Sequence, residues 1–126
     1  MDRIEVYLCD DVAALRLVVR TVLELEPSIT IVGEAGDGEV ALQELGRLRP
    51  DVLVLDLSLP GRDGLEILEA MPDLSPRTKV IVFSGYPRGQ LAESALARGA
   101  KRYLEKGVDM DAVVAAVLEV AAEASP

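Results

Sequence analysis

Residues 52–61 read Val-Leu-Val-Leu-Asp-Leu-Ser-Leu-Pro-Gly. The first four are aliphatic and uninterrupted, which is typical of a short strand buried on both faces of a parallel sheet. The Pro60-Gly61 pair is typical of a turn. The stretch therefore predicts an interior parallel strand that is followed directly by Asp56 and then by a loop.

The same arrangement of strand and helix repeats along the whole chain. Four more short runs rich in β-branched residues are predicted strands: residues 4–9, 29–32, 79–83 and 102–104. Apolar residues with helical spacing occupy the segments between and after them: residues 12–25, 38–48, 64–71, 89–98 and 109–122. Alternation of this kind predicts right-handed crossovers and an α/β fold, a doubly wound five-stranded parallel sheet with helices on both faces.

Several residues mark the expected helix ends. Pro50 and Pro72 follow helical segments, where a proline blocks continuation of the helix. Asp37 and Asp109 are suited to be N-caps, and Gly99 is suited to the left-handed position after a helix. The length of 126 residues fits one domain, which we expect at residues 1–124 with residues 125–126 as a tail.

Composition excludes several classes of function. The formal charge of -9 disfavours direct contact with nucleic acid or with anionic membranes. The absence of histidine rules out histidine catalysis and a phosphohistidine carrier. The single cysteine, Cys9, cannot form an internal disulfide and is interpreted as a small buried apolar residue. Residues 1–5 resemble neither a signal peptide nor a membrane span, so we expect a cytoplasmic location.

Polar residues follow four of the five predicted strands: Asp10-Asp11, Asp56, Ser84 and Lys106. In an open parallel sheet, ligands bind outside the carboxyl ends of the strands, so these residues are expected to converge. Each also has a simpler interpretation. Asp11 is suited to cap a helix, Asp56 to form a turn, Ser84 to end a strand, and Lys106 to be a solvated surface charge.

Three convergent carboxylates require a cation. Two of them about 4 Å apart repel by roughly 4 kcal/mol at an effective dielectric of about 20. An oxygen-rich cluster with few ligands suits Mg²⁺, which completes its coordination with water and phosphate oxygens. Lys106 and Ser84 can then bind the same phosphate, and Asp56 can be the nucleophile that forms an acyl phosphate. No glycine-rich nucleotide loop is present, so another molecule must donate the phosphoryl group.

Four stretches resemble the receiver domain of bacterial two-component response regulators, in the subgroup often linked to a helix-turn-helix output domain. They are Asp10-Asp11 with Arg16, residues 52–64, residues 81–85, and residues 103–106. The resemblance implies the flavodoxin-like strand order 2-1-3-4-5. Many members of the family have a proline after the lysine, where this chain has Gly107.

The resemblance also implies roles for individual residues. Asp10, Asp11, Asp56 and the backbone carbonyl of Ser58 would bind Mg²⁺, and Asp56 would accept a phosphoryl group from a sensor histidine kinase. Ser84 and Tyr103 would then switch, with Tyr103 moving from an exposed to a buried rotamer. The changed surface, formed by the last two helices and the strand between them, would control an output domain or partner protein and allow a homodimer.

Such a domain is a phosphoacceptor switch that assists its own phosphorylation and dephosphorylation, and is not an enzyme acting on a substrate. Two alternatives stay open. One is a Mg²⁺-dependent phosphohydrolase, although Ser58 stands where such enzymes usually carry a second aspartate. The other is an inert adaptor with the same fold, which the retention of all five polar positions argues against.

The segment 12–25 is apolar around much of its circumference. Four of its residues are predicted to pack on the sheet: Leu15, Val18, Val19 and Val22. Ala14 and Leu17 are predicted to help dock the helical phosphodonor domain of the kinase. The alternative is a helix that is buried on all sides.

Overall fold

The computed structural model describes residues 3–124, so the predicted tail at 125–126 lies outside the described residues. It contains five strands: β1 (Ile4–Cys9), β2 (Ile29–Ala35), β3 (Val52–Leu55), β4 (Lys79–Ser84) and β5 (Arg102–Glu105). The helices alternate with them: α1 (Ala13–Glu24), α2 (Gly38–Leu48), α3 (Gly64–Leu74), α4 (Arg88–Ala97) and α5 (Met110–Ala122). No helix within residues 3–124 is both long enough and apolar enough to cross a membrane.

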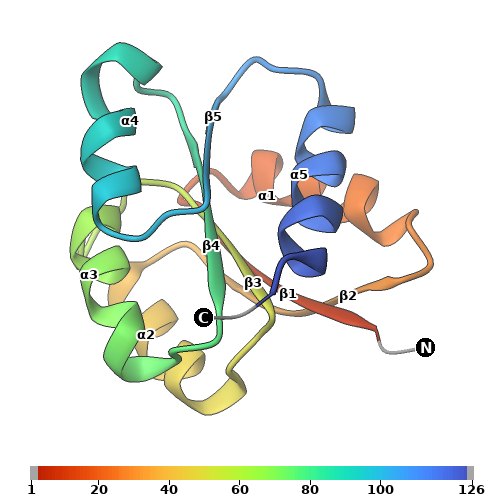
Figure 1. Ribbon diagram of the computed structural model, residues 1–126, viewed down its shortest axis with the longest axis horizontal. Helices are drawn as coiled ribbons and strands as arrows, with labels where there is room; N and C mark the ends of the chain where they lie inside the picture. The colour runs from red at the N-terminus through yellow and green to blue at the C-terminus, as the bar shows by residue number, and fades with distance from the viewer. Residues whose placement is uncertain (1–2, 125–126) are drawn as a thin grey trace.

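All the strands lie in one parallel sheet in the order β2-β1-β3-β4-β5 (Figure 1). β3 lies in the centre, with Cys9 of β1 level with Leu55 on one side and Val82 of β4 on the other. All four residues of β3 are buried, as the uninterrupted apolar run predicts. The predicted fold class and strand order are confirmed.

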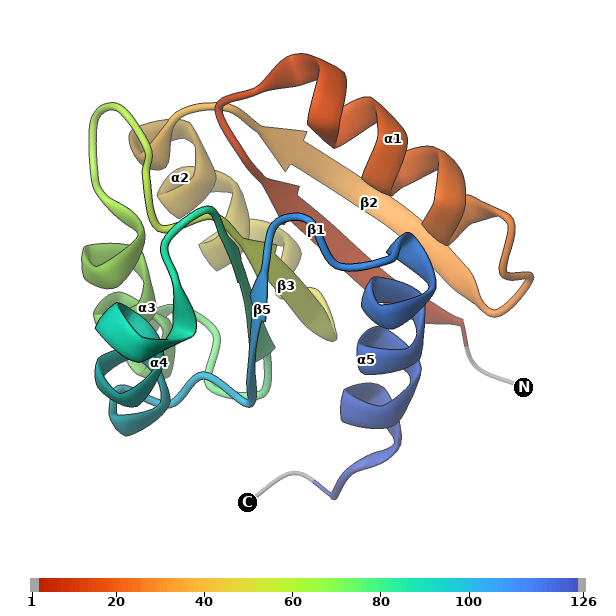
Figure 2. The same cartoon turned by 90° about the horizontal axis from the view of Figure 1, so that it is seen from above.

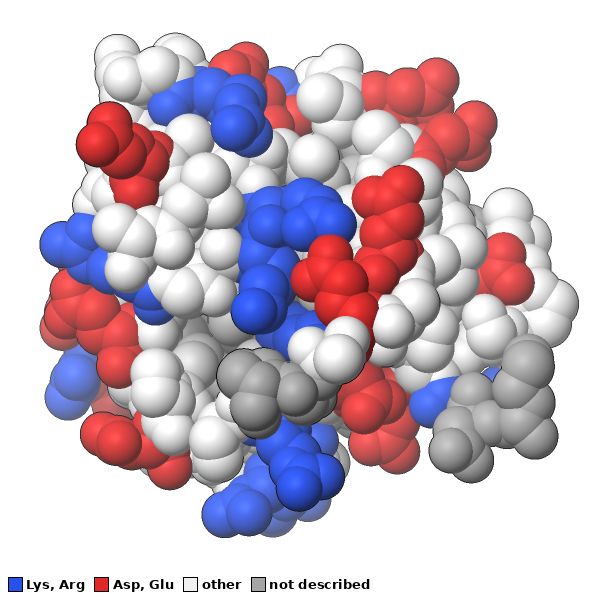
Figure 3. All heavy atoms as spheres, in the orientation of Figure 1, with Lys and Arg blue, Asp and Glu red and all other residues white. Residues whose placement is uncertain are grey.

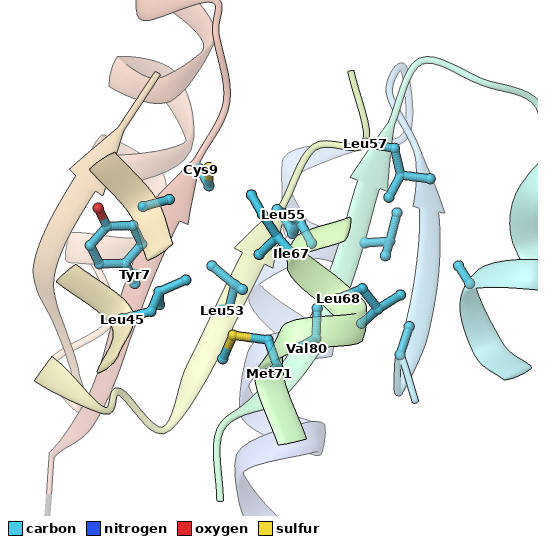
Figure 4. Close-up of a cluster of buried hydrophobic side chains, with 14 of the residues drawn as sticks. Tyr7, Cys9, Leu45, Leu53, Leu55, Leu57, Ile67, Leu68, Met71 and Val80 are labelled. Carbon is cyan, nitrogen blue, oxygen red and sulfur yellow. The ribbon is translucent and has the colours of Figure 1, made fainter. Parts of the chain in front are cut away.

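Helices cover both faces of the sheet, with α1 and α5 on one side and α2, α3 and α4 on the other (Figure 2). Side chains alternate between two cores, so Leu53 and Leu55 face α3, whereas Val52 and Val54 face the α1 and α5 side. Figure 4 shows Leu53 and Leu55 beside Ile67 of α3. Cys9 is buried in the same core, and burial raises the pKa of its thiol to about 12, as expected of an unreactive packing residue.

Side chains cap several of the helices as the sequence predicts. The carboxylates of Asp37 and Asp109 accept hydrogen bonds from backbone N–H groups at the starts of α2 and α5. Gly99 follows α4 with φ of 106°, in the left-handed region that favours glycine. Asp63 begins α3 with a capping box to Glu66, which we did not predict.

Two element ends, those of α3 and β2, differ from the prediction by more than one residue. Pro72 lies inside α3 and does not end it. Proline has no N–H, so one backbone hydrogen bond of the helix is lost. The next turn still forms, because Ser75 N–H donates to the carbonyl of Met71 at 2.9 Å. β2 continues through Gly33 to Ala35. A Cβ at Gly33 would lie 2.8 Å from the ring of Tyr7, so glycine here makes room for a neighbouring side chain and does not end the strand.

Helix α1 buries a narrower face than predicted. Val19 is buried and Leu15 and Val22 are half-buried, but 46% of Val18 is exposed, so its predicted packing on the sheet is wrong. The 3.6-residue period turns Val18 away from the buried stripe that contains Val19 and Leu23. The alternative of a helix buried on all sides is also wrong, because 63% of Leu17 is exposed.

Candidate functional site

Three carboxylates meet at the carboxyl edge of the sheet. Asp10 and Asp11 directly follow β1, and Asp56 directly follows the neighbouring strand β3. One oxygen of each carboxylate lies within 4.8 Å of one oxygen of the other two. Asp10 and Asp56 are buried, whereas Asp11 is exposed at the rim. The predicted convergence of these residues is what the fold produces.

Lys106 joins the two buried carboxylates. Its Nζ lies 2.9 Å from Asp10 Oδ2 and 3.0 Å from Asp56 Oδ2. The backbone N–H of Lys106 donates to the carbonyl of Ser84 at 2.7 Å, which holds this loop against the end of β4. Gly107 follows with φ of 108°, where a side chain would be strained. The interpretation of Lys106 as a solvated surface charge is therefore wrong.

The remaining oxygens of the buried carboxylates are bound by the backbone. Asp56 Oδ1 accepts from the N–H of Ser58 at 3.1 Å, so Asp56 also organises its turn. Asp10 Oδ1 accepts from the N–H of Val12 at 2.9 Å, at the start of α1. Asp11 makes no cap to α1, so the interpretation of Asp11 as a helix cap is wrong.

Ser84 and Tyr103 lie beside this cluster and contact the same loop. Ser84 is fully buried, and its Oγ accepts from the N–H of Tyr86 at 3.1 Å. Tyr103 is 2% exposed, and its hydroxyl donates to the carbonyl of Tyr86 at 2.7 Å. Both side chains hold the loop between β4 and α4, but neither hydrogen-bonds the three carboxylates within residues 3–124.

An open cleft of about 280 Å³ lies over the cluster, lined by Asp11, Asp56, Ser58, Gly85, Tyr86 and Lys106. It leaves room for a ligand of phosphate size and for water molecules next to Asp56. Carboxylate oxygens this close together, open to solvent on one side, are the ligand set that a hard divalent cation prefers. The acidic pocket therefore fits a metal ion of this kind.

Burial and charge pairing have opposite effects on the pKa values of Asp56 and Lys106. Burial raises the pKa of Asp56, and the bonds from Ser58 N–H and Lys106 only partly offset this effect. Burial also lowers the pKa of Lys106, but the bonds to Asp10 and Asp56 outweigh it, so the pKa is raised. At neutral pH the site therefore keeps a cationic lysine beside a carboxylate whose charge is costly to bury.

The raised pKa of Asp56 predicts a pH-dependent cost in stability. The folded state holds the Asp56 proton to higher pH than the unfolded chain does, so stability falls as pH rises above the ordinary value of about 3.9. We expect Asp56→Asn to raise the midpoint of thermal unfolding by a few degrees at pH 7 in EDTA. No gain is expected at about pH 3.9 or below, where the wild-type carboxyl is protonated in the folded state. Circular dichroism melts of Asp56→Asn and of the exposed Asp51→Asn check this. A wild type at least as stable as Asp56→Asn at pH 7 contradicts it.

Two residues that we did not predict connect α4 to β5. The start of α4 has no side-chain cap of its own, and Glu105 of β5 accepts from the N–H of Arg88 at 2.6 Å. The Arg88 guanidinium lies 5.9 Å from the ring centre of Tyr103 and donates to its carbonyl at 2.6 Å. No local sequence signal marks these contacts, because the partners are 15 or more residues apart.

Residues 6–118 match the family model of the response regulator receiver domain. The chain belongs to this family. The receiver domain is 36% identical over 117 residues to the nitrate/nitrite response regulator protein NarL of Escherichia coli K12, covering 93% of this chain and 54% of that protein. It is 37% identical over 120 residues to a protein-glutamate methylesterase/protein-glutamine glutaminase of Carboxydothermus hydrogenoformans, covering 94% of this chain and 35% of that protein. The chain thus spans about half of the first relative and about a third of the second.

Solved structures agree with this assignment. The receiver domain superposes on the signal receiver domain of a NarL protein from Mycobacterium tuberculosis with a TM-score of 0.90 and 33% identity, covering 96% of this chain and 98% of that one. The response regulator domain of Thermotoga maritima CheB gives a TM-score of 0.82 with 28% identity, covering 94% of this chain and 93% of that one. The chain is a receiver domain of the two-component response regulators.

Proposed function

We propose that the receiver domain accepts a phosphoryl group on Asp56 from a sensor histidine kinase, in a reaction that depends on Mg²⁺. The observation that carries this proposal is the position of the Asp56 carboxylate. It lies on an open cleft, 3.0 Å from the Lys106 ammonium and next to two further carboxylates. A nucleophile, a cation for the incoming phosphoryl oxygens and a metal site are thereby within reach of one another.

In the proposed reaction a carboxylate oxygen of Asp56 forms a bond to phosphorus as the P–N bond of a phosphohistidine breaks. The imidazole leaves with the electron pair of that bond. Lys106 moves from the carboxylates to a phosphoryl oxygen, while the Ser58 N–H keeps the Asp56 side chain oriented. Asp10, Asp11, Asp56 and the carbonyl of Ser58 would hold Mg²⁺, which supplies charge neutralisation at the phosphoryl group.

We further propose that Ser84 and Tyr103 convert phosphorylation into a changed surface. A Ser84 hydroxyl that turns to donate to a phosphoryl oxygen leaves its present position, in which it accepts from Tyr86 N–H, and the hydroxyl of Tyr103 donates to the carbonyl of the same Tyr86. The bonds from Arg88 to Tyr103 and Glu105 then connect the loop to α4 and β5. Such a switch requires that phosphate binds one state of the loop better than the other.

The output surface in this proposal is formed by α4, β5 and α5. Figure 3 shows basic side chains gathered near the middle of one face, over β5, with acidic side chains beside them toward α5. Arg102 and Glu123 form an ion pair between β5 and the end of α5 at 2.6 Å. We propose that this surface contacts an output domain, a partner protein or a second copy of the chain. We also propose that the protein acts in the cytoplasm and that this chain does not itself contact nucleic acid. The boundary of the domain at residue 124 stays a prediction.

Incubation of the protein with acetyl phosphate and Mg²⁺, followed by intact mass, tests the proposal. One added phosphoryl group is expected with Mg²⁺ and none in EDTA. Turnover of a phosphomonoester without lasting modification would instead favour the phosphohydrolase, and no modification at all would favour the adaptor.

The exposed side of α1 is proposed to bind the kinase. Ala14 and Leu17 are exposed as predicted, and Val18 and Leu25 extend the apolar surface with 46% and 78% exposure. We expect Leu17→Glu to slow phosphotransfer from the cognate kinase about tenfold or more, because a charge would be buried in the docked complex.

The matched control is Val40→Glu on α2, where the replaced valine is 46% exposed on another helix. Both variants should react with acetyl phosphate at the wild-type rate, since a small donor needs no docking surface. Wild-type phosphotransfer by Leu17→Glu would refute the docking role of α1.

A further inference from the structure

The side chain of Arg16 turns back from α1 toward the acidic pair. Its Nη1 donates to the backbone carbonyl of Asp10 at 2.6 Å, a short charge-assisted bond. Its Nε donates to Glu34 of β2 at 3.0 Å. Arg16 is 19% exposed, so the guanidinium is packed between α1 and the ends of β1 and β2. The two bonds use different edges of the guanidinium and together set its orientation.

The surroundings of Arg16 leave room for this position. A Cβ at Gly36 would lie 2.7 Å from Arg16 Nη1, so any larger residue would occupy the space of the guanidinium. The hydrogen bond from Arg16 is the main cause that lowers the pKa of Glu34, burial partly opposes it, and the bond from Arg20 lowers it further, so this carboxylate is charged at neutral pH. Arg20 binds the other oxygen of Glu34 at 2.5 Å but does not contact Asp10.

The carbonyl that Arg16 binds belongs to the peptide between Asp10 and Asp11. Within residues 3–124, the Asp11 side chain makes no hydrogen bond, so its direction depends on the backbone. The first turn of α1 has no side-chain cap, so this backbone is held by the bond from Val12 N–H to Asp10 Oδ1 at 2.9 Å and by the bond from Arg16 to the Asp10 carbonyl. Rotation of this peptide would move the Asp11 carboxylate away from Asp10 and Asp56.

We propose that Arg16 is a positioning residue for the cation site, which holds the peptide between Asp10 and Asp11 so that both carboxylates converge on the ion bound beside Asp56. This inference rests on the proposed function. A second role of Arg16, as a nearby positive charge, has the opposite sign. If charge alone mattered, its removal would tighten Mg²⁺ binding, whereas loss of positioning weakens it.

Calorimetric titration of the folded protein with Mg²⁺ at fixed ionic strength tests the proposal. We expect Arg16→Gln to bind Mg²⁺ about tenfold more weakly than wild type, as for other residues that orient metal ligands. Arg20→Gln is the matched control, because it removes the same charge from the same glutamate without touching Asp10, and should bind as wild type. Amide NMR shifts of Asp11 without metal should differ from wild type in Arg16→Gln but not in Arg20→Gln.

Gly36→Ala provides a second variant in case Arg16→Gln does not fold. It keeps the arginine in the chain but displaces its guanidinium, and should also weaken Mg²⁺ binding. Binding by Arg16→Gln or Gly36→Ala as tight as wild type, or tighter, overturns the inference. Failure of wild type itself to bind Mg²⁺ overturns the proposed function instead, so the two failures are distinguishable.

Discussion

Asp56→Asn is expected to gain no phosphoryl group when incubated with acetyl phosphate and Mg²⁺ under conditions that modify wild type fully. The amide of asparagine is neutral and cannot attack phosphorus as a carboxylate does. Asp56 is the carboxylate that both lines the cleft and contacts Lys106 within the described residues. The intact mass of the protein after incubation measures the effect, which should be complete.

The matched control is Asp51→Asn, because Asp51 lies at the start of β3 on the opposite edge of the sheet, where its carboxylate accepts a bond from Glu5 N–H. This variant should gain the phosphoryl group at the wild-type rate. Modification of Asp56→Asn to the same extent as wild type would show that another group, such as Asp10 or Asp11, is the acceptor. The assignment of Asp56 would then be wrong, even if the chain is phosphorylated.

Lys106→Met should slow phosphorylation by acetyl phosphate about a hundredfold, the usual effect of removing one preorganised donor from a transition state. Within residues 3–124, Lys106 is the cation that forms ion pairs with the carboxylates of the site. Methionine keeps much of the length of the side chain and removes the charge. The rate of phosphoryl gain, followed by intact mass over time, measures the effect.

The Mg²⁺ affinity of Lys106→Met shows whether the variant loses only the charge that assists phosphoryl transfer or also loses the metal site. Loss of a positive charge next to the metal should leave Mg²⁺ affinity unchanged or tighter, while the reaction slows. Lys101→Met is the control, since Lys101 precedes β5 at the opposite edge of the sheet and forms no ion pair within the described residues. A wild-type rate in Lys106→Met would remove Lys106 from the proposed mechanism.

Most of the fold was predictable because its signals are local. The run at 52–55 and the four similar runs predicted every strand, and the aspartates at 37 and 109 predicted two helix starts. The errors came from residues whose local preference was overridden by neighbours. Proline usually ends a helix, yet α3 continues past Pro72. Glycine is unusual inside a strand, yet β2 continues through Gly33, where only glycine leaves room for the ring of Tyr7.

The convergence of the site was predictable for a topological reason. Parallel strands all end at one edge, so residues at or just after the ends of β1, β3, β4 and β5 must come near one another whatever their separation in the chain. The identities of Asp10, Asp11, Asp56, Ser84 and Lys106 could therefore be read from their positions after strands. Which of them touch could not be read in the same way.

The amino-acid sequence by itself determined the parallel sheet, its helical layers and the set of polar residues at its carboxyl edge, because apolar period and strand-end position are local properties. Only the tertiary structure decided that Lys106 bridges Asp10 and Asp56, that Glu105 caps α4, and that Arg16 binds the Asp10 carbonyl. These contacts join residues from separate elements, and their geometry depends on how the helices pack on the sheet. Side-chain direction across an interface is set by that packing, and no pattern within one segment contains it.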